Sequence, residues 1–312
     1  MPKPLVIVST LPEAQNEALE KHPGISLIRH AGEPWRLPTR ADALFTFQSQ
    51  WKNAPADAPD GWPFGLKWLQ VASAGVDTFP RWALSLPLVA RERGIQAPAI
   101  AEYVIGAVFA HEKRFWDGSV RDQEAWSHKM LGGVAGKTIG IAGMGAIGEE
   151  VARLALAVGM RVAAVTRRSS VKLAGVEAVA ELSSLFATSD HVALTLPLTP
   201  ETRRCVGPAC FAAVKPGLHL INVARGAIID TPALLAALDS SRLSGATLDV
   251  TEVEPPSEGD PLYTHKKVRL TPHVSGMSEM TDRRMNEFLI ANITAYLAGG
   301  EIVGKVETSQ GY

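Results

Sequence analysis

Residues 137–148 of this 312-residue chain read KTIGIAGMGAIG. Residues 137–142 predict a buried strand, and apolar residues three and four apart between Ile147 and Val158 predict a helix directly after the glycines. A second predicted strand, 160–166, follows at once. A strand, a glycine-rich turn, a helix and a second strand in this order are typical of a dinucleotide-binding unit, because the turn lets the backbone approach a pyrophosphate.

The residues of this turn form the first candidate site. Gly143, Gly145 and Gly148 would provide a tight turn, close approach to the pyrophosphate and close packing of helix on strand. Ala146 and Ile147 would begin the helix, whose free N–H groups and positive dipole end would face the phosphates. The alternative interpretation is a tight structural turn that binds no ligand.

The end of the second strand indicates which dinucleotide would bind. A carboxylate there would hydrogen-bond the ribose 2′-hydroxyl of NAD, whereas this chain has Thr166, Arg167 and Arg168 followed by two serines. Guanidinium and hydroxyl groups suit a 2′-phosphate, because Arg forms paired, charge-assisted bonds to phosphate oxygens. We therefore expect NADPH/NADP, with NAD as the weaker alternative. A solvated basic turn is the other interpretation of these residues.

Composition excludes several classes of partner. The chain has 31 basic and 32 acidic residues, so no positive excess favours nucleic acid or an anionic membrane. No apolar stretch is long enough to cross a bilayer and the first residues do not resemble a signal peptide, so we expect a soluble cytoplasmic protein. Cys205 and Cys210 lack the spacing of a metal cage, and we expect buried thiols and no metal.

Short strands alternate with helical or loop segments on both sides of the glycine turn, which predicts parallel α/β architecture. Strands are predicted before the turn at 5–8, 25–28, 44–47 and 67–71, and after residue 166 at 191–196, 218–223, 246–250 and 268–270. The last predicted helix, 279–298, lies beyond the second set. We therefore predict a Rossmann-type, doubly wound dinucleotide-binding domain over residues 98–276, inserted into a smaller flavodoxin-like α/β substrate domain formed by residues 1–97 and 277–312.

Ligands of open α/β sheets bind beyond the carboxyl ends of the strands, and three polar side chains follow predicted strands of the second set. These are Arg225, Glu254 and His273. Reduction of a 2-oxo acid by hydride transfer needs a cation that holds the carboxylate and polarises the carbonyl, and an acid that protonates the new alkoxide. The planar fork of Arg225 suits the first role, His273 suits the second, and Glu254 would orient the imidazole. Each could instead be an ordinary polar loop residue.

Several short motifs occur in a fixed order along the chain. They are SAGVD at 73–77, the glycine turn at 143–148, NVARG at 222–226, LDV at 248–250 with EP at 254–255, and TPH at 271–273. In this order they resemble the D-isomer-specific 2-hydroxyacid dehydrogenases, and the resemblance covers nearly the whole chain. The resemblance implies the same catalytic set and an inserted nucleotide domain through which two copies form a homodimer.

The resemblance also implies binding roles. The backbone of Ala74, Gly75 and Val76 would hold the substrate carboxylate, and Asp249 would bind the nicotinamide carboxamide. Four further residues would border the cofactor, namely Leu196, Pro197, Val223 and Ala224.

Within the family, the Arg167-Arg168 turn and the Gly311-Tyr312 ending resemble the glyoxylate/hydroxypyruvate reductase A branch, whereas FQSQW at 47–51, expected to face the substrate, departs from it. We predict NADPH-dependent reduction of a small 2-oxo acid, glyoxylate or hydroxypyruvate, to the D-2-hydroxy acid. One alternative is a broader dehydrogenase for larger 2-oxo acids, favoured by a roomy pocket near Phe47 and Trp51. The other is a non-catalytic protein that senses a nucleotide.

Overall fold

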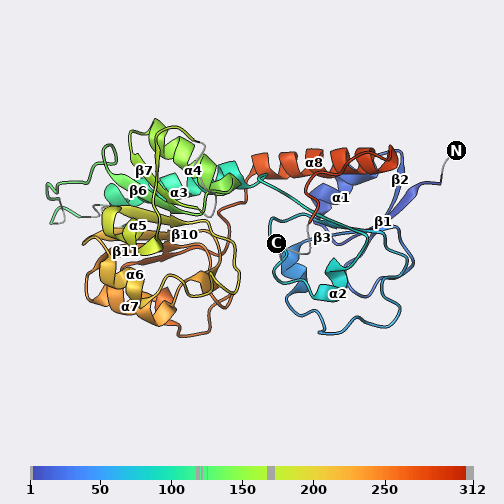
Figure 1. Cartoon of the computed structure of the whole chain (residues 1–312), viewed down its shortest axis with the longest axis horizontal. Helices are drawn as coiled ribbons and strands as arrows, with labels where there is room; N and C mark the ends of the chain where they lie inside the picture. Colours follow the sequence, from blue (N-terminus) through green and yellow to red (C-terminus); the bar gives the residue numbers. More distant parts are fainter. Residues whose placement is uncertain (1–2, 117–119, 121, 125, 167–172, 307–312) are drawn as a thin grey trace. The chain divides into compact units, whose positions relative to one another are not determined.

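The computed structural model describes residues 3–116, 120, 122–124, 126–166 and 173–306. Its contacts divide the chain into two compact units, Met1–Ile95 with Ser278–Tyr312, and Gln96–Met277 (Figure 1). The boundaries from the sequence were placed after residues 97 and 276, whereas the contacts place them after Ile95 and Met277. None of the helices formed by the described residues combines the length and apolarity needed to cross a bilayer.

The first unit contains a five-stranded parallel sheet in the order β2-β1-β3-β4-β5. The strands are β1 Leu5–Ser9, β2 Ile25–Arg29, β3 Ala43–Thr46, β4 Trp68–Val71 and β5 Leu88–Arg91, and the helices are α1 Glu13–Glu20, η1 Gln48–Trp51, α2 Arg81–Leu84 and α8 Glu279–Leu297. This strand order is that of flavodoxin-like sheets. Helix α8 belongs here because its buried residues Met285, Leu289 and Ile293 pack with Ile7 of β1 and Leu19 of α1.

The second unit contains a seven-stranded parallel sheet in the order β12-β11-β10-β9-β6-β7-β8. Its strands are β6 Thr138–Ala142, β7 Arg161–Val165, β8 Val176–Ala178, β9 His191–Leu194, β10 Leu218–Asn222, β11 Leu243–Leu248 and β12 Val268–Leu270. Its helices are α3 Ala97–Glu112, α4 Ala146–Ala157, α5 Leu182–Thr188, α6 Pro208–Ala213, η2 Gly226–Ile228, α7 Thr231–Asp239 and η3 Pro261–Tyr263.

Helices cover both faces of this second sheet. Residues of α3 and α4 form one buried cluster with inward-facing strand residues, and residues of α5, α6 and α7 form another (Figure 1). The strand order reverses between β6 and β9, as in doubly wound dinucleotide-binding sheets. The predicted fold class is confirmed: a Rossmann-type sheet unit is inserted into a smaller flavodoxin-like unit.

Three imidazoles are packed together at the amino-terminal end of β9 and β10. His191 Nδ1 lies 3.2 Å from His219 Nδ1, and His219 Nε2 lies 2.9 Å from Thr247 Oγ1. The ring of His111 stacks on His219 with centroids 4.1 Å apart, and His191 Nε2 lies 3.2 Å from Glu112 Oε1. Burial, reinforced by His111 and His191, holds the pKa of His219 well below its ordinary value. His219 is therefore a neutral donor or acceptor within the folded unit.

The neutral state of His219 predicts a loss of stability in acid. A histidine in the unfolded chain titrates near pH ~6.5, so below that pH the unfolded state binds more protons than the folded state. The free energy of unfolding should then fall by up to about 1.4 kcal/mol per pH unit between about pH 6.5 and 5. His219→Gln should reduce this slope in urea unfolding measured at each pH, whereas His22→Gln, outside the cluster, should not. Equal slopes in wild-type and H219Q protein would contradict the assignment.

Candidate active site

The carboxyl ends of β10, β11 and β12 lie side by side at one edge of the seven-stranded sheet. Backbone bonds continue their register beyond the strands, because the Asp249 N–H donates to Asn222 O at 3.0 Å and the His273 N–H donates to Asp249 O at 2.9 Å. The loops that carry Arg225, Glu254 and His273 therefore leave the sheet from adjacent strands.

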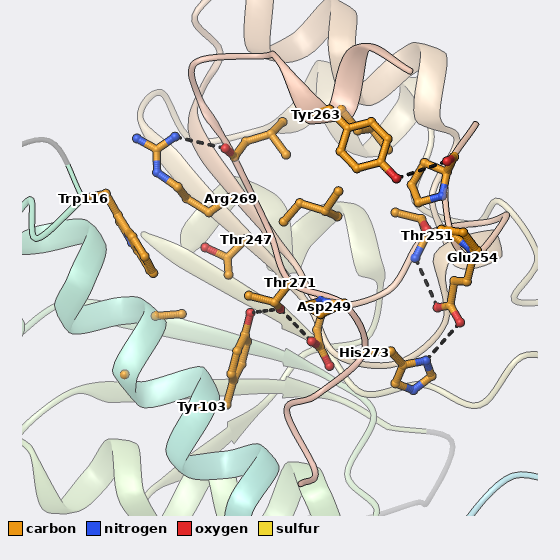
Figure 2. A pocket seen from close by; sticks show the side chains of 18 residues that line it. Tyr103, Trp116, Thr247, Asp249, Thr251, Glu254, Tyr263, Arg269, Thr271 and His273 are labelled. Atoms are coloured by element: carbon orange, nitrogen blue, oxygen red, sulfur yellow. Dashed lines mark hydrogen bonds and ion pairs between the residues drawn. The ribbon is translucent and has the colours of Figure 1, made fainter. Parts of the chain in front are cut away.

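His273 and Glu254 form a pair in the structure (Figure 2). His273 Nδ1 lies 3.1 Å from Glu254 Oε2, and Glu254 Oε1 accepts a hydrogen bond from the Thr251 N–H at 3.4 Å. The His273 side chain is 50% exposed and that of Glu254 24%. Since Nδ1 is directed at the Glu254 carboxylate, Nε2 is the ring nitrogen that remains for a ligand. This geometry suits a histidine that exchanges a proton through Nε2.

Arg225 stands at the start of η2 in a loop that its neighbours hold rigidly. The buried Asn222 side chain accepts from the Ala224 N–H and donates to Arg225 O, each at 3.0 Å. Gly226 allows close packing, because a Cβ at this position would collide with the backbone of Thr251. The arginine loop thus packs directly against the loop that leads to Glu254.

The three glycines of the turn have different surroundings. Gly143 has φ 107°, a left-handed conformation that favours glycine, and a Cβ on Gly148 would collide with the Gly143 carbonyl oxygen. A Cβ on Gly145 would meet no protein atom within 4 Å, although Gly145 directly precedes the first residue of α4, Ala146. Open space at the amino end of a helix fits a phosphate group, so the residues present fit a dinucleotide. Ile147 packs against the core cluster beneath α3 and α4.

Two further strand ends border this turn. Thr195, after β9, donates from Oγ1 to Gly143 O at 2.7 Å, which places the Leu196-Pro197 segment beside the glycine turn. Val223 and Ala224 are buried after β10, and Thr166 directly follows β7. Arg167 and Arg168 lie outside the described residues.

The Asp249 carboxylate accepts hydrogen bonds from nearby residues of the same unit. It is 2% exposed and accepts from Thr271 Oγ1 at 2.6 Å (Figure 2). It also accepts from the Val274 and Ser275 N–H groups at 2.9 Å each. Its predicted contact with the nicotinamide carboxamide stays a proposal. Thr195, at a strand end, and Tyr103, in α3, were not singled out from the sequence, whereas Asn222 and Thr271 appeared there only as members of the NVARG and TPH motifs.

The predicted carboxylate-binding residues Ala74, Gly75 and Val76 belong to the first unit, after β4. Val76 is buried, and the Arg91 guanidinium donates to Ala74 O. Nearby, the Gln48 N–H donates to Ser73 Oγ at 3.1 Å, which ties η1 to this loop.

The expectation that Trp51 faces the substrate is wrong. Trp51 is 1% exposed, stacks on Phe79 with centroids 4.6 Å apart, and donates its indole N–H to Thr46 Oγ1 at 3.0 Å. Its large apolar ring is enclosed in the aromatic core of the first unit, and its one polar atom has a partner there. The other four residues of the segment, 47–50, are half-buried or exposed and are left to shape a substrate site.

A cavity of about 840 Å³ opens beside the His273 and Glu254 pair within the second unit. Figure 2 shows that Tyr103, Trp116 and Tyr263 surround it, with Asp249 at its base. Its lining is mostly apolar, which is typical of sites that exclude water from bound organic molecules.

Comparison with known proteins defines the class. Residues 105–275 match the model of the NAD-binding domain of D-isomer specific 2-hydroxyacid dehydrogenases. The chain therefore belongs to this family of NAD(P)-dependent dehydrogenases, and the family predicted from the sequence is confirmed.

Named relatives are consistent with this class. The chain is 36% identical over 205 residues to the hydroxypyruvate reductase of Thermotoga maritima, which covers 64% of this chain and 67% of the relative. A D-isomer specific 2-hydroxyacid dehydrogenase from Xanthobacter autotrophicus, solved with NADPH and MES, has a TM-score of 0.83 at 27% identity and covers 99% of this chain and 100% of its own. An NADPH-dependent glyoxylate/hydroxypyruvate reductase from Sinorhizobium meliloti, solved with NADP and sulfate, has a TM-score of 0.80 at 27% identity with the same coverage. The matches span 52% to 67% of the length of the first three curated relatives.

The different surroundings of Gly145 and Gly148 predict different outcomes for the same substitution. Gly148→Ser should lower the free energy of unfolding by about 1–3 kcal/mol, because its Cβ would collide with the Gly143 carbonyl. Gly145→Ser should keep that stability, since serine is at least as good a helix N-cap as glycine, but its side chain would enter the phosphate space and weaken NAD(P)H binding. Urea unfolding and fluorescence titration with NADH and NADPH measure the two effects. A destabilised G145S, or one that binds both dinucleotides like wild type, would contradict this division of roles.

Proposed function

We propose that this protein is an NADPH-dependent reductase of small 2-oxo acids, with glyoxylate or hydroxypyruvate as substrate and the D-2-hydroxy acid as product. The observation that carries the proposal is the His273 and Glu254 pair on a sheet edge that also carries the Arg225 loop. When bound, NADPH supplies the hydride. The backbone at Gly143 and Gly145 and the amino end of α4 would hold its pyrophosphate, and Thr166, Arg167 and Arg168 its 2′-phosphate.

His273 acts as the proton donor in this proposal. Its Nε2 protonates the carbonyl oxygen as negative charge develops there, while Glu254 on Nδ1 fixes the ring and stabilises its positive charge. Arg225 binds the carboxylate and polarises the carbonyl, because its guanidinium presents parallel N–H donors and stays charged at any working pH. In the first unit, the proposed ligand of the substrate carboxylate is the backbone of residues 74–76.

The surroundings of η1 favour a small substrate. The alternative of larger 2-oxo acids drew on a roomy pocket near Phe47 and Trp51, and Trp51 is enclosed in the core. The loop is also restrained, because Gln48 Nε2 donates to Asp77 Oδ1 at 2.8 Å. A restrained polar residue suits a short, hydrophilic 2-oxo acid better than a long apolar one.

A homodimer is part of the proposal. Large apolar side chains are exposed on the segment after α3, with Trp116 59%, Trp126 75% and Met130 97% exposed. Exposed apolar groups gathered on one segment mark an interaction surface, and the proposed occupant is a second copy of the chain.

The cofactor preference is tested by comparing kcat/KM for NADPH and NADH. We expect NADPH to be preferred, and replacement of Arg167 and Arg168 together by Ala to lower kcat/KM for NADPH by about 10- to 100-fold while leaving NADH unchanged, because NADH lacks the phosphate. Arg161→Ala is the matched control, since this exposed arginine begins β7 at the opposite end of the strand. Wild-type preference for NADH would refute the NADPH assignment.

The catalytic roles are tested by two substitutions. His273→Ala should lower kcat by about 10²- to 10⁴-fold with a modest change in KM, because it removes the proton donor. Arg225→Ala should raise KM as well, because it also removes the ligand of the carboxylate. Steady-state reduction of glyoxylate and hydroxypyruvate measures both, with His22→Ala as a control. Near-normal kcat in H273A would exclude His273 from the mechanism.

A further inference from the structure

A chain of hydrogen bonds runs from helix α3 to the loop that carries His273. The hydroxyl of Tyr103 lies 2.6 Å from Thr271 Oγ1, and Thr271 Oγ1 donates to Asp249 Oδ1 at 2.6 Å. Figure 2 shows the three side chains in line at the wall of the cavity. Tyr103 thus contacts a residue 168 positions later in the sequence, two positions before the proposed proton donor.

The direction of this chain follows from the number of protons available. An ionised carboxylate only accepts, so the single hydroxyl proton of Thr271 is directed at Asp249. Thr271 Oγ1 must then accept from the Tyr103 hydroxyl. Burial raises the pKa of the Tyr103 hydroxyl. The hydrogen bond with Thr271 lowers this pKa and the nearby Asp249 charge raises it, and the net effect is a raised pKa, so the phenol keeps its proton.

Asp249 connects the hydrogen bond between Tyr103 and Thr271 to the backbone around His273. Besides Thr271, its carboxylate binds the N–H groups of Val274 and Ser275, and its carbonyl oxygen accepts from the His273 N–H. His273 itself has φ 56°, a left-handed conformation that costs a non-glycine residue energy and persists where the surroundings enforce it. Asp249 takes part in most of the bonds that hold this loop, and the His273 N–H also donates to Thr271 O at 3.0 Å.

We propose that Tyr103 is a positioning residue for proton transfer, whose hydroxyl acts through Thr271 and Asp249 to fix the loop that aims the His273 imidazole. The proposal rests on the proposed function in one respect, that His273 is the proton donor. Tyr103 touches neither the imidazole nor, in this scheme, the reacting atoms. Its contribution is the orientation of the ring, which governs kcat more than substrate binding.

Tyr103→Phe tests the proposal, with Tyr296→Phe as the matched control. Tyr296 lies on α8 in the first unit, where its ring stacks on Trp68 with centroids 5.0 Å apart, and it belongs neither to the cavity lining nor to the Asp249 chain. Y103F should lower kcat for glyoxylate about fivefold, equivalent to one net hydrogen bond, and change KM less than about twofold. Y296F should match wild type. Unchanged kcat in Y103F, or an equal loss in Y296F, would overturn the proposal.

A double variant separates positioning from general damage to the fold. In the H273A background no imidazole is left to orient, so Y103F should lower the residual kcat no further. A second, fully additive fivefold loss would show that Tyr103 acts on overall structure and would overturn the proposal.

A readout without turnover separates this proposal from the proposed function. The ring-proton resonance of His273, assigned by its absence in H273A, should shift in Y103F and stay in place in Y296F. If wild-type protein reduced no 2-oxo acid, or H273A kept full kcat, the proposed function would fail while this resonance still tests the link between Tyr103 and His273. An unshifted resonance in Y103F would overturn the link.

Discussion

Backbone hydrogen bonds carry the parallel register of β10, β11 and β12 past the last residues of these strands, from Asn222 to Asp249 and from Asp249 to His273. Strand β10 is buried throughout and β11 everywhere except Ser244, so both permit little adjustment and their loops begin at fixed points. The pairing of His273 with Glu254 and the contact between the Arg225 loop and the Glu254 loop both depend on this constraint. The polar side chains of the site follow the strand ends, where backbone N–H and C=O groups no longer have partners in a neighbouring strand.

The histidines at the two ends of the second sheet differ in their exposure and in their partners. At the amino-terminal end, His191 and His219 are buried and have partners within the protein. At the carboxyl-terminal end, the His273 side chain is half exposed. Among the contacts of the described residues, its ring is held at Nδ1 by Glu254. Burial holds the pKa of His219 well below its ordinary value, whereas His273 is open to solvent and faces a carboxylate. Only the second arrangement can deliver a proton to a ligand.

Periodicity and position were enough to predict the parts of the fold that have strong local signals. The buried strand before the glycines, the helix after them and the polar residues after β10, β11 and β12 all follow from short patterns. Strands β5 and β8 were missed, because LVAR and VEA are edge strands of only four and three residues and each contains a charged residue. The inward position of Trp51 was also missed, since a tryptophan beside polar residues gives no sign of which way it turns.

The partners of the site were the hardest part to predict. Tyr103 lies in an apolar helix, where its periodicity predicts core packing, and its hydroxyl meets a residue far along the chain. Thr195 bonds to the glycine turn 52 positions earlier. Such contacts depend on which strands lie next to one another in the sheet, and no short stretch of the sequence indicates that arrangement.

The central claim, hydride and proton delivery to a small 2-oxo acid, is tested most directly by a single-turnover reaction. Enzyme in excess over NADPH would be mixed with glyoxylate or hydroxypyruvate, the loss of reduced nicotinamide followed, and the hydroxypyruvate product resolved by chirality. The account predicts one hydroxy acid formed per NADPH consumed, with glycerate of D configuration. No loss of reduced nicotinamide, or glycerate of L configuration, would contradict it.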